Sequence, residues 1–465
     1  MKLMKFKTAN KAVMFASAII LAGASGTVLA KLTPEELAKV GTTGQELTPS
    51  GAIRAGNAEG TIPEWKNEPI VPPANFKVGT YHADPFADDK VLFKITASNY
   101  KEHADKLTAG QQHMFETYAN FYMNIYQTRR SAVFNSYVYG SALKNAATAE
   151  VVVGATGGLG FKNARASWAF PIPKNGNEAL LNAITRPQSP GMSSYQTTAP
   201  VTASGAYIVN KLSANTINKW SDPSVTDYNQ EVDGLRYYQT ILAPAKVAGQ
   251  VLLVRDPQEF STARRKAWVY SPGQRRVKRA PQVLYDNPWT ASDGLATTDQ
   301  KWGYNGPTDR FDWKLIGRKE IYVPYNAYKL HGKDATPENI INSEGRIDQE
   351  YSRYELHRVW VVEGTLKEGT NHVYGSRTFF LDEDSWWVML ADNYDRRGQI
   401  WRYWESHDVM YYDTQFLNTA SAVQYDMQAG RMISLGYDKK KKLDLSWRAP
   451  EKFFTPATVR RSGIR

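Results

Sequence analysis

The sequence predicts an α+β protein dominated by a large antiparallel β-sheet. The main observation is the segment 353–405, where β-branched and aromatic runs are separated by short turns of the kind that join neighbouring antiparallel strands. A second is the aromatic content, with 27 Tyr, 17 Phe and 13 Trp in 465 residues, which fits a β-rich fold, a sugar-binding surface or an apolar cavity equally well. A third is that helical patterns are short, whereas strand patterns recur from residue 206 onward.

The segment 353–405 is expected to form a meander of four strands. Its first strand, 356–366, places Trp360 and Val362 on one apolar side of the pleat. Short polar turns are expected to close its three hairpins, at 367–370, 382–385 and 395–398. A sheet with one apolar face must either pack on another layer or curl around something.

Residues 1–30 have the pattern of a secretory signal peptide. Four lysines precede an apolar run at 12–24, and Val28-Leu29-Ala30 fits the small-residue rule for cleavage. The run is too short to cross a hydrocarbon core of about 30 Å, so we expect cleavage and no transmembrane span in the mature protein. The sequence has no cysteine, which excludes a lipid-modified N-terminal cysteine, disulfides and thiolate catalysis.

The chain is basic, with a formal net charge of +11, of which +7 would remain without the four lysines of the signal peptide. Such a net positive charge suits binding to an acidic partner surface, for example anionic lipid head groups. Nucleic acid is not expected as the ligand of an exported protein.

Residues 31–200 are expected to form an N-terminal arm and a helical covering region. Local patterns predict a helix that starts after Thr33 (33–37), an extended arm (41–90), a helix capped by Thr108 (99–123), an alternating strand-like stretch (126–138), a short helix (176–186) and a loop (187–200). Residues 201–465 are expected to form the antiparallel sheet, in one continuous domain with 31–200.

The remaining strands of 201–465 follow from composition and turn chemistry. They are expected at 206–212, 235–243, 249–254, 266–270, 277–284, 313–322 and, as the last strand, 422–427. A type II turn at 271–274 is expected from its Pro-Gly pair. The segment 285–312 has hardly any periodicity, and a loop of that length in a compact region is usually functional or mobile.

No convincing catalytic or metal-binding set is visible. The histidines lack metal-ligand spacing, and the Gly-x-Ser-x-Gly motif of serine hydrolases is missing. The acidic turn 382–384 beside Trp386 and Trp387 is the best indication of an enzyme, because glycosidases use carboxylates near aromatic rings. Acids in hairpin turns more often satisfy backbone amides and stay hydrated, so we expect no catalytic residue, no metal and no cofactor. Calcium binding by the aspartates of 286–312 stays open.

The segment 264–281 carries seven positive residues and no acid. Such runs are usually solvated faces, but this density exceeds what solubility requires. We therefore predict that it docks on an anionic surface or a partner through Arg264, Arg265, Arg275, Arg276, Lys278 and Arg279.

Several short motifs of the sequence resemble those of two known families. Segments 268–281, 380–386 and 394–398 resemble the outer-membrane lipoprotein-sorting carriers of the LolA-like group. A wider resemblance, over most of the mature chain, is to an exported family called domain of unknown function 1329, through Gln-Thr-Arg-Arg at 127–130, Phe-Pro-Ile-Pro at 170–173, Asp-Trp-Lys-Leu at 312–315 and Tyr-Val-Pro-Tyr-Asn at 322–326.

These resemblances imply a curved antiparallel half-barrel, with helices covering its concave face around an apolar cavity, and no catalytic residues. Members of the second family are often associated with exporters of the resistance-nodulation-division type, which implies a hand-over role in the periplasm. From the alternation of the strands we predict that the cavity wall includes Trp268, Tyr270, Trp360, Val362, Val388 and Leu390.

The sequence therefore favours a periplasmic carrier of lipids or other hydrophobic molecules, unanchored or peripheral at the outer membrane. Its expected partners are the ligand and an exporter or outer-membrane protein. Two alternatives stay open. One is an envelope carbohydrate-binding protein or glycosidase, and the other is a structural partner of an export complex.

Overall fold

The computed structural model describes residues 31–155, 157–229, 231–441 and 443–462. The expected signal peptide, 1–30, lies outside the described residues. Among the helices of the described residues, none has the length and hydrophobicity needed to cross a membrane.

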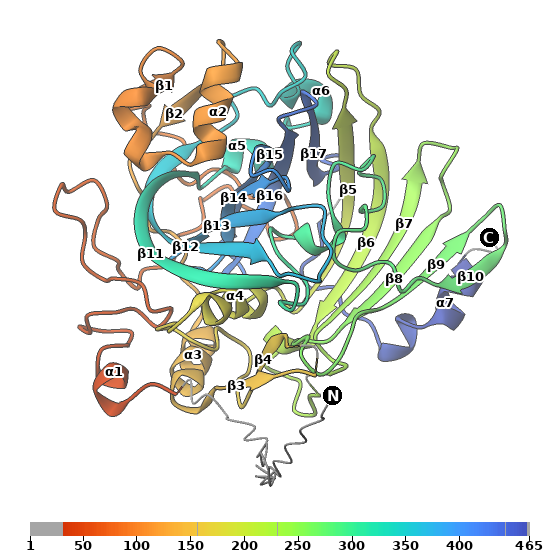
Figure 1. Ribbon diagram of the computed structural model, residues 1–465, viewed down its shortest axis with the longest axis horizontal. Coiled ribbons are helices and arrows are strands. Elements are labelled where there is room, and N and C mark those ends of the chain that lie inside the picture. Colours follow the sequence, from red (N-terminus) through yellow and green to blue (C-terminus); the bar gives the residue numbers. More distant parts are fainter. Residues whose placement is uncertain (1–30, 156, 230, 442, 463–465) are drawn as a thin grey trace, which may run out of the picture.

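One large β-sheet organises the chain, as the sequence predicts (Figure 1). Its strands are β1 (Phe93–Thr96), β2 (Tyr122–Ile125), β5 (Gly191–Val201), β6 (Asn210–Asn218), β7 (Leu235–Ala243), β8 (Val251–Asp256), β9 (Lys266–Ser271), β10 (Arg276–Arg279), β11 (Phe311–Pro324), β12 (Tyr354–Leu366), β13 (Ser376–Asp382), β14 (Val388–Tyr394), β15 (Ile400–Tyr411), β16 (Phe416–Asp426) and β17 (Arg431–Tyr437). The spatial order is β1-β2-β12-β13-β14-β15-β16-β17-β5-β6-β7-β8-β9-β10, with β11 also paired to β12. Figure 1 shows β11 and β12 curling around one end of the sheet, while β5 to β10 fan out toward the other.

The smaller elements lie around this sheet. The helices are α1 (Pro34–Ala38), α2 (Ala109–Thr117), α3 (Ser136–Thr148), α4 (Gly176–Thr185), α5 (Tyr328–His331), α6 (Pro337–Ile340) and α7 (Pro456–Ser462), with short 3-10 turns at Tyr100–Lys106, Lys219–Ser221, Thr298–Gln300 and Glu451–Phe453. A separate hairpin consists of β3 (Glu150–Val153) and β4 (Leu159–Lys162).

Several local expectations are corrected by the structure. The stretch 126–138 does not form a strand; instead α3 begins within it, because the Asn135 side chain accepts a hydrogen bond from the amide of Val138 and caps the helix. The stretch 187–200 contains β5 rather than a loop, since pairing with β17 and β6 overrides its Ser- and Thr-rich composition.

Two further corrections concern turns and strand ends. The 271–274 turn is not type II, because Gly273 is not left-handed; the chain turns one residue later, where Arg275 has φ 48°. The expected last strand is part of β16, and β17 follows it as one more strand of the meander.

The two faces of the sheet are covered by different elements. The face that carries Trp404 and Leu252 is here called the inner face; directly paired residues share a face, so the register extends it from β12 to β9. The end of α4 lies on this inner face, where Ile184 lines a small cavity together with Leu235 of β7. The opposite, outer face is covered by α2, where Gly110 approaches Tyr403, and by α7, where Val459 packs in one cluster with Leu253.

The acidic turn between β13 and β14 is buried, and not hydrated as hairpin turns usually are. Arg130 donates to both oxygens of Asp384, at 2.9 and 2.7 Å, and to the carbonyl of Ile53 at 2.9 Å. Glu383 accepts from Arg358 at 3.0 Å and from the amide of Ile53 at 3.2 Å. This cluster, here called the acidic-turn network, joins the N-terminal arm to the sheet.

Breaking the acidic-turn network should destabilise the fold strongly. The Arg130 side chain is 3% exposed, so Arg130→Met leaves Asp384 buried without its partner. We expect the free energy of unfolding, measured by urea denaturation, to fall by about 3–5 kcal/mol.

The matched control is Arg397→Met, which removes an arginine that is 73% exposed and paired with Asp395. That change should lower the free energy of unfolding by less than about 1 kcal/mol. Equal losses in the two variants would show that the network does not hold the arm.

Candidate ligand-binding site

The inner face of the sheet carries two adjoining cavities beneath the long loop that precedes β11. The first has a volume of about 60 Å³ and the second about 50 Å³. Residues 285–305, here called the roof loop, cover both, and three of them, Trp289, Lys301 and Trp302, line both. The two cavities together are called the trough.

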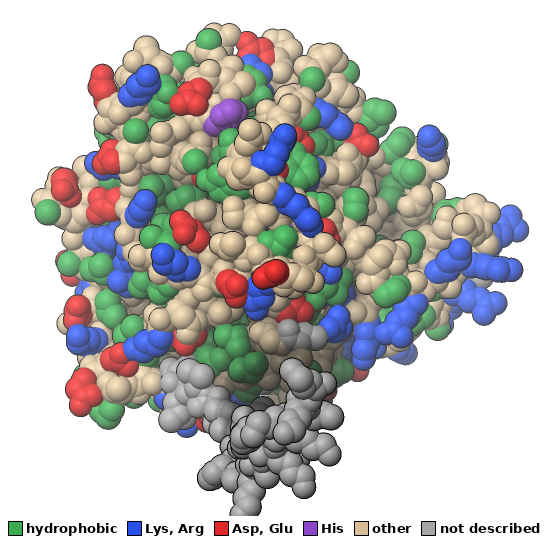
Figure 2. All heavy atoms as spheres, viewed as in Figure 1, with side chains coloured by type: hydrophobic (Ala, Val, Ile, Leu, Met, Phe, Trp, Pro, Cys, Tyr) green, Lys and Arg blue, Asp and Glu red, His purple; other side chains and the backbone are tan. Residues whose placement is uncertain are grey.

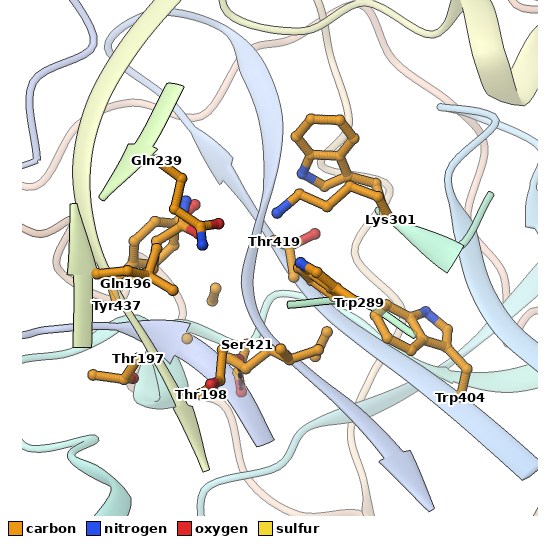
Figure 3. Close-up of a pocket in the computed structure, with 16 residues that line it drawn as sticks. Gln196, Thr197, Thr198, Gln239, Trp289, Lys301, Trp404, Thr419, Ser421 and Tyr437 are labelled. Atoms are coloured by element: carbon orange, nitrogen blue, oxygen red, sulfur yellow. Dashed lines mark hydrogen bonds between the residues drawn. The ribbon is translucent and has the colours of Figure 1, made fainter. Parts of the chain in front are cut away.

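The two ends of the trough differ in polarity. The floor of the first cavity comes from β5, β6, β7, β15, β16 and β17 and includes Gln196, Thr198, Gln239, Ser421 and Tyr437 (Figure 3). The floor of the second comes from β7 and β8 and is mainly apolar, with Leu235, Tyr237, Leu252, Val254 and Val283 from the adjoining chain. An elongated molecule in the trough would therefore meet polar groups at one end and apolar groups at the other.

The roof loop is anchored at the base by buried polar contacts. Asp299 accepts from Arg377 at 2.7 Å, and Gln300 donates to Gln424 of β16 at 2.9 Å. Lys301 follows directly, so its backbone is held in place. The outer half of the loop is a hairpin of its own, closed by pairing of Pro288 with Thr297.

Backbone strain is concentrated in the roof loop. Tyr285, Ala291, Asp293 and Trp302 all have left-handed φ angles, between 50° and 64°, which non-glycine residues rarely adopt. Such strain persists when surrounding contacts over-determine the conformation, and it is common at ligand-binding sites.

Lys301 places its ammonium group among three aromatic rings. Its Nζ lies 4.5 Å from the centroid of the Trp289 ring and 5.1 Å from the centroids of Trp302 and Tyr237. No carboxylate of the described residues lies within ion-pair distance of this group. Burial, and after it the charge of Arg265, lower the pKa of Lys301 to about 7.

Two further hydrogen-bond donors that line the first cavity have no partner among the described residues. The Gln239 side chain accepts from the Tyr237 hydroxyl at 2.8 Å through Oε1, but its Nε2 donates to nothing. The indole Nε1 of Trp404 is likewise unpaired, and both side chains are at most 2% exposed. Buried donors of this kind normally have an acceptor.

The predicted cavity wall is only partly on the inner face. Trp360, Val362 and Val388 are on the inner face but lie in the main core rather than in the trough. Leu390 is on the outer face, where it pairs with Glu405.

Trp268 and Tyr270 also face outward, where they pack with Phe454 and Val459 of the C-terminal segment. In β9 the neighbouring Val269 faces the inner side. The prediction placed these two residues one position out of phase, because alternation alone cannot tell which face is covered by which element.

The predicted docking residues separate into two groups. Arg264, Arg275, Arg276, Lys278 and Arg279 are exposed at or beside the β9–β10 hairpin, and Figure 2 shows basic side chains gathered at that end of the molecule. Arg265 is different. It donates to both oxygens of Asp256, at 2.6 and 2.8 Å, and its side chain is 5% exposed, so it belongs to the fold.

The acids considered for catalysis or calcium are engaged elsewhere. His357, Asp382 and Asp384 lie close enough together to ligate a metal ion, but Asp384 is already held by both nitrogens of the Arg130 fork. None of the three lines the trough. The roof-loop aspartates are dispersed, each beside its own partner; for example, Asp286 pairs with Arg310 and Asp293 with Arg431.

The trough residues Lys301, Trp289, Trp302 and Gln239 were not predicted from the sequence. One signal pointed to them. The sequence of the roof loop is too long and too irregular for a simple connection, and it contains both tryptophans. Lys301 is recognised as a candidate binding residue only from the aromatic rings that surround it in the structure.

The fold and the trough define a β-sheet protein with a covered apolar face, and comparisons with known proteins place it in a family. The sequence matches the family described as "Protein of unknown function (DUF1329)" over residues 94–460, and the chain belongs to that family. It is 41% identical over 445 residues to the uncharacterized protein PA3922 of Pseudomonas aeruginosa, covering 94% of this chain and 95% of that protein.

Solved structures with a similar fold are distant in sequence. A DUF1329 family protein from Desulfovibrio piger is 13% identical, covers 60% of this chain and 95% of its own, and has a TM-score of 0.41. A putative outer membrane lipoprotein-sorting protein domain from Vibrio parahaemolyticus is 12% identical, with 60% and 94% coverage and a TM-score of 0.40. A LolA superfamily protein from Nitrosomonas europaea is 14% identical, with 61% and 98% coverage and a TM-score of 0.36.

Proposed function

We propose that this protein binds a hydrophobic molecule in the trough and carries it in the bacterial periplasm. The observation that carries the proposal is the covered inner face: apolar side chains of β7 and β8 line a cavity whose roof is a strained, aromatic loop. Each methylene that such a surface removes from water contributes about 0.8 kcal/mol, so a modest apolar chain supplies enough free energy for micromolar binding.

The trough in this conformation holds only a short apolar segment, so a longer chain requires the roof loop to move. The outer hairpin of the loop is the part suited to this. Its movement would break contacts with the sheet, such as the hydroxyl of Thr198 donating to the carbonyl of Ala291 at 3.0 Å and Arg402 donating to the carbonyl of Gly294 at 2.8 Å. It would also uncover Leu295, which packs in the main core. The base at Asp299 and Gln300 stays fixed.

Binding of this kind needs no catalytic group. Of the carboxylates of the acidic turn, which a glycosidase would use, Glu383 and Asp384 are paired with arginines in the acidic-turn network, and Asp382 accepts hydrogen bonds from Tyr325 and Ser385. No observation favours the carbohydrate alternative over a carrier. The periplasmic location rests on the export signal expected in 1–30, and hand-over to an exporter of the resistance-nodulation-division type rests on the sequence resemblance alone.

Filling the trough should block binding. Ala422 of β16 lines the first cavity and is 4% exposed, so Ala422→Leu adds three carbons to a space of about 60 Å³. We expect an apolar fluorescent probe to bind at least about tenfold more weakly, because the added carbons would displace two or more methylenes of the probe from the cavity. Probe titration measures this.

The matched control is Ala203→Leu, in the exposed turn between β5 and β6. It adds the same atoms outside the trough and should leave probe affinity unchanged. If Ala422→Leu folds and binds the probe as well as the parent protein does, the trough is not the site; if the parent binds no apolar probe, the carrier proposal fails.

We further propose that the β9–β10 hairpin docks on an anionic membrane surface. β10 is the last strand of the sheet, and Arg460 and Arg461 of α7, which contacts β10, are exposed beside its basic side chains. Basic residues near an anionic bilayer contribute about 1 kcal/mol each. The trough extends along the inner face toward this edge, which would bring its apolar end close to the membrane.

Neutralising the hairpin should weaken membrane binding. Replacing Arg275, Arg276, Lys278 and Arg279 by Ser should lower the affinity for vesicles of phosphatidylglycerol by roughly tenfold or more, and raising salt should do the same because the attraction is screened over about 10 Å at 0.1 M. Vesicle co-sedimentation measures both effects.

A control variant with Lys66, Lys77, Lys101 and Lys333 replaced by Ser has the same net charge but keeps the hairpin. It should bind vesicles nearly as well as the parent protein. Equal weakening in both variants would mean that net charge alone acts, and that the hairpin charges serve only to keep an edge strand from pairing with other chains.

A further inference from the structure

We propose that the trough selects amphiphiles that carry one negative charge, and that Lys301 and Gln239 bind the charged group. This inference rests on the proposed function and specifies the ligand of the same site. The shared chemistry is an acyl chain ending in a singly charged oxygen group, either the carboxylate of a fatty acid or the phosphodiester of a phospholipid.

The first argument is an excess of unpaired donors in the polar cavity. Lys301 has no carboxylate partner, and the Nε2 of Gln239 and the Nε1 of Trp404 donate to nothing among the described residues. Within the described part of the chain, no acidic side chain lines this cavity. An oxygen anion would satisfy these donors, whereas a purely apolar ligand would leave them buried and unpaired, at a cost for each.

The second argument is the position of Lys301 between the two cavities. It lines both, and Figure 3 shows its side chain extending from the roof loop into the first cavity, where Gln239 approaches from β7. Tyr237 connects the two groups, because its hydroxyl contacts Gln239 and its ring lies 5.1 Å from the lysine Nζ. A charged head held here leaves its chain over Leu252 and Val254 of the apolar cavity.

The third argument is that the ammonium group is held in place before any ligand arrives. Asp299 and Gln300 anchor the adjacent backbone, and the rings of Trp289 and Trp302 fix the side chain. Rings attract the cation but leave its hydrogen-bond donors without oxygen acceptors. Burial lowers the pKa of Lys301 to about 7, and a bound anion would favour the charged form and reverse part of that shift.

The test compares ligands that share a chain and differ in charge. Dodecanoic acid, dodecanol and lysophosphatidylglycerol are titrated against the delipidated protein by displacement of an apolar fluorescent probe at about pH 6, where Lys301 is protonated. We expect one of the two anions to bind at least about tenfold more tightly than dodecanol, as a charge-assisted hydrogen bond predicts. Which anion binds more tightly identifies the head group.

Variants at the site then assign the preference to these side chains. Lys301→Met should bring anion and alcohol within about threefold of each other without weakening the alcohol, and Lys301→Arg should retain the preference because it retains the charge. Gln239→Glu places a negative charge beside the head group and should weaken the anion by about tenfold or more. Circular dichroism and thermal unfolding verify that each variant is folded.

The pH dependence is an independent readout. Between about pH 6 and pH 9 the free protein loses the Lys301 proton, so the advantage of the anion over dodecanol should shrink in the parent protein and stay flat in Lys301→Met. Equal affinity of the parent protein for anion and alcohol at pH 6, or a preference that survives in Lys301→Met, overturns this inference and leaves the carrier function standing. Failure of all three ligands to bind overturns both.

Discussion

The acidic-turn network is the constraint on which the rest of the structure depends. Three consecutive carboxylates lie at the buried turn between two central strands. Arginines from other parts of the chain pair with Asp384 and Glu383, which makes their burial tolerable, and Asp382 accepts hydrogen bonds from Tyr325 and Ser385. Arg130 binds both the turn and carbonyls of the N-terminal arm, so arm, turn and sheet form together. The arm is thereby fixed against the curled part of the sheet formed by β11 to β13.

The part of the sheet held by the acidic-turn network supports the roof loop, a more strained element over the other half of the sheet. The roof loop is anchored where Asp299 meets Arg377 of β13, and from there it extends over β7 and β8. A fixed base with a separate outer hairpin is a suitable arrangement for a binding site. The groups that recognise the ligand stay in place, while the cover that excludes water can move.

The proposed functions of the trough and of the basic hairpin fit together in space. The apolar cavity lies over β7 and β8, and the basic edge strand lies two strands farther along the same sheet. A hydrophobic ligand exchanged at a membrane would then travel a short path along one inner face. The lysine at the far end of that path would hold the charged group after the chain has entered.

The sequence by itself determined the β-dominated fold, the meander of 353–405 and the exposed basic hairpin, because short-range alternation and turn residues specify strands and tight connections. It did not determine the face assignment of Trp268 and Tyr270, the burial of Asp382 to Asp384, or the site around Lys301. The alternation of apolar and polar residues shows which residues of a strand share a face. It does not show which face α7 or the roof loop covers, because that depends on contacts between segments far apart in the chain. A lysine in a loop becomes a binding group only when β7 brings Tyr237 and Gln239 beside it, and only the tertiary structure decided that.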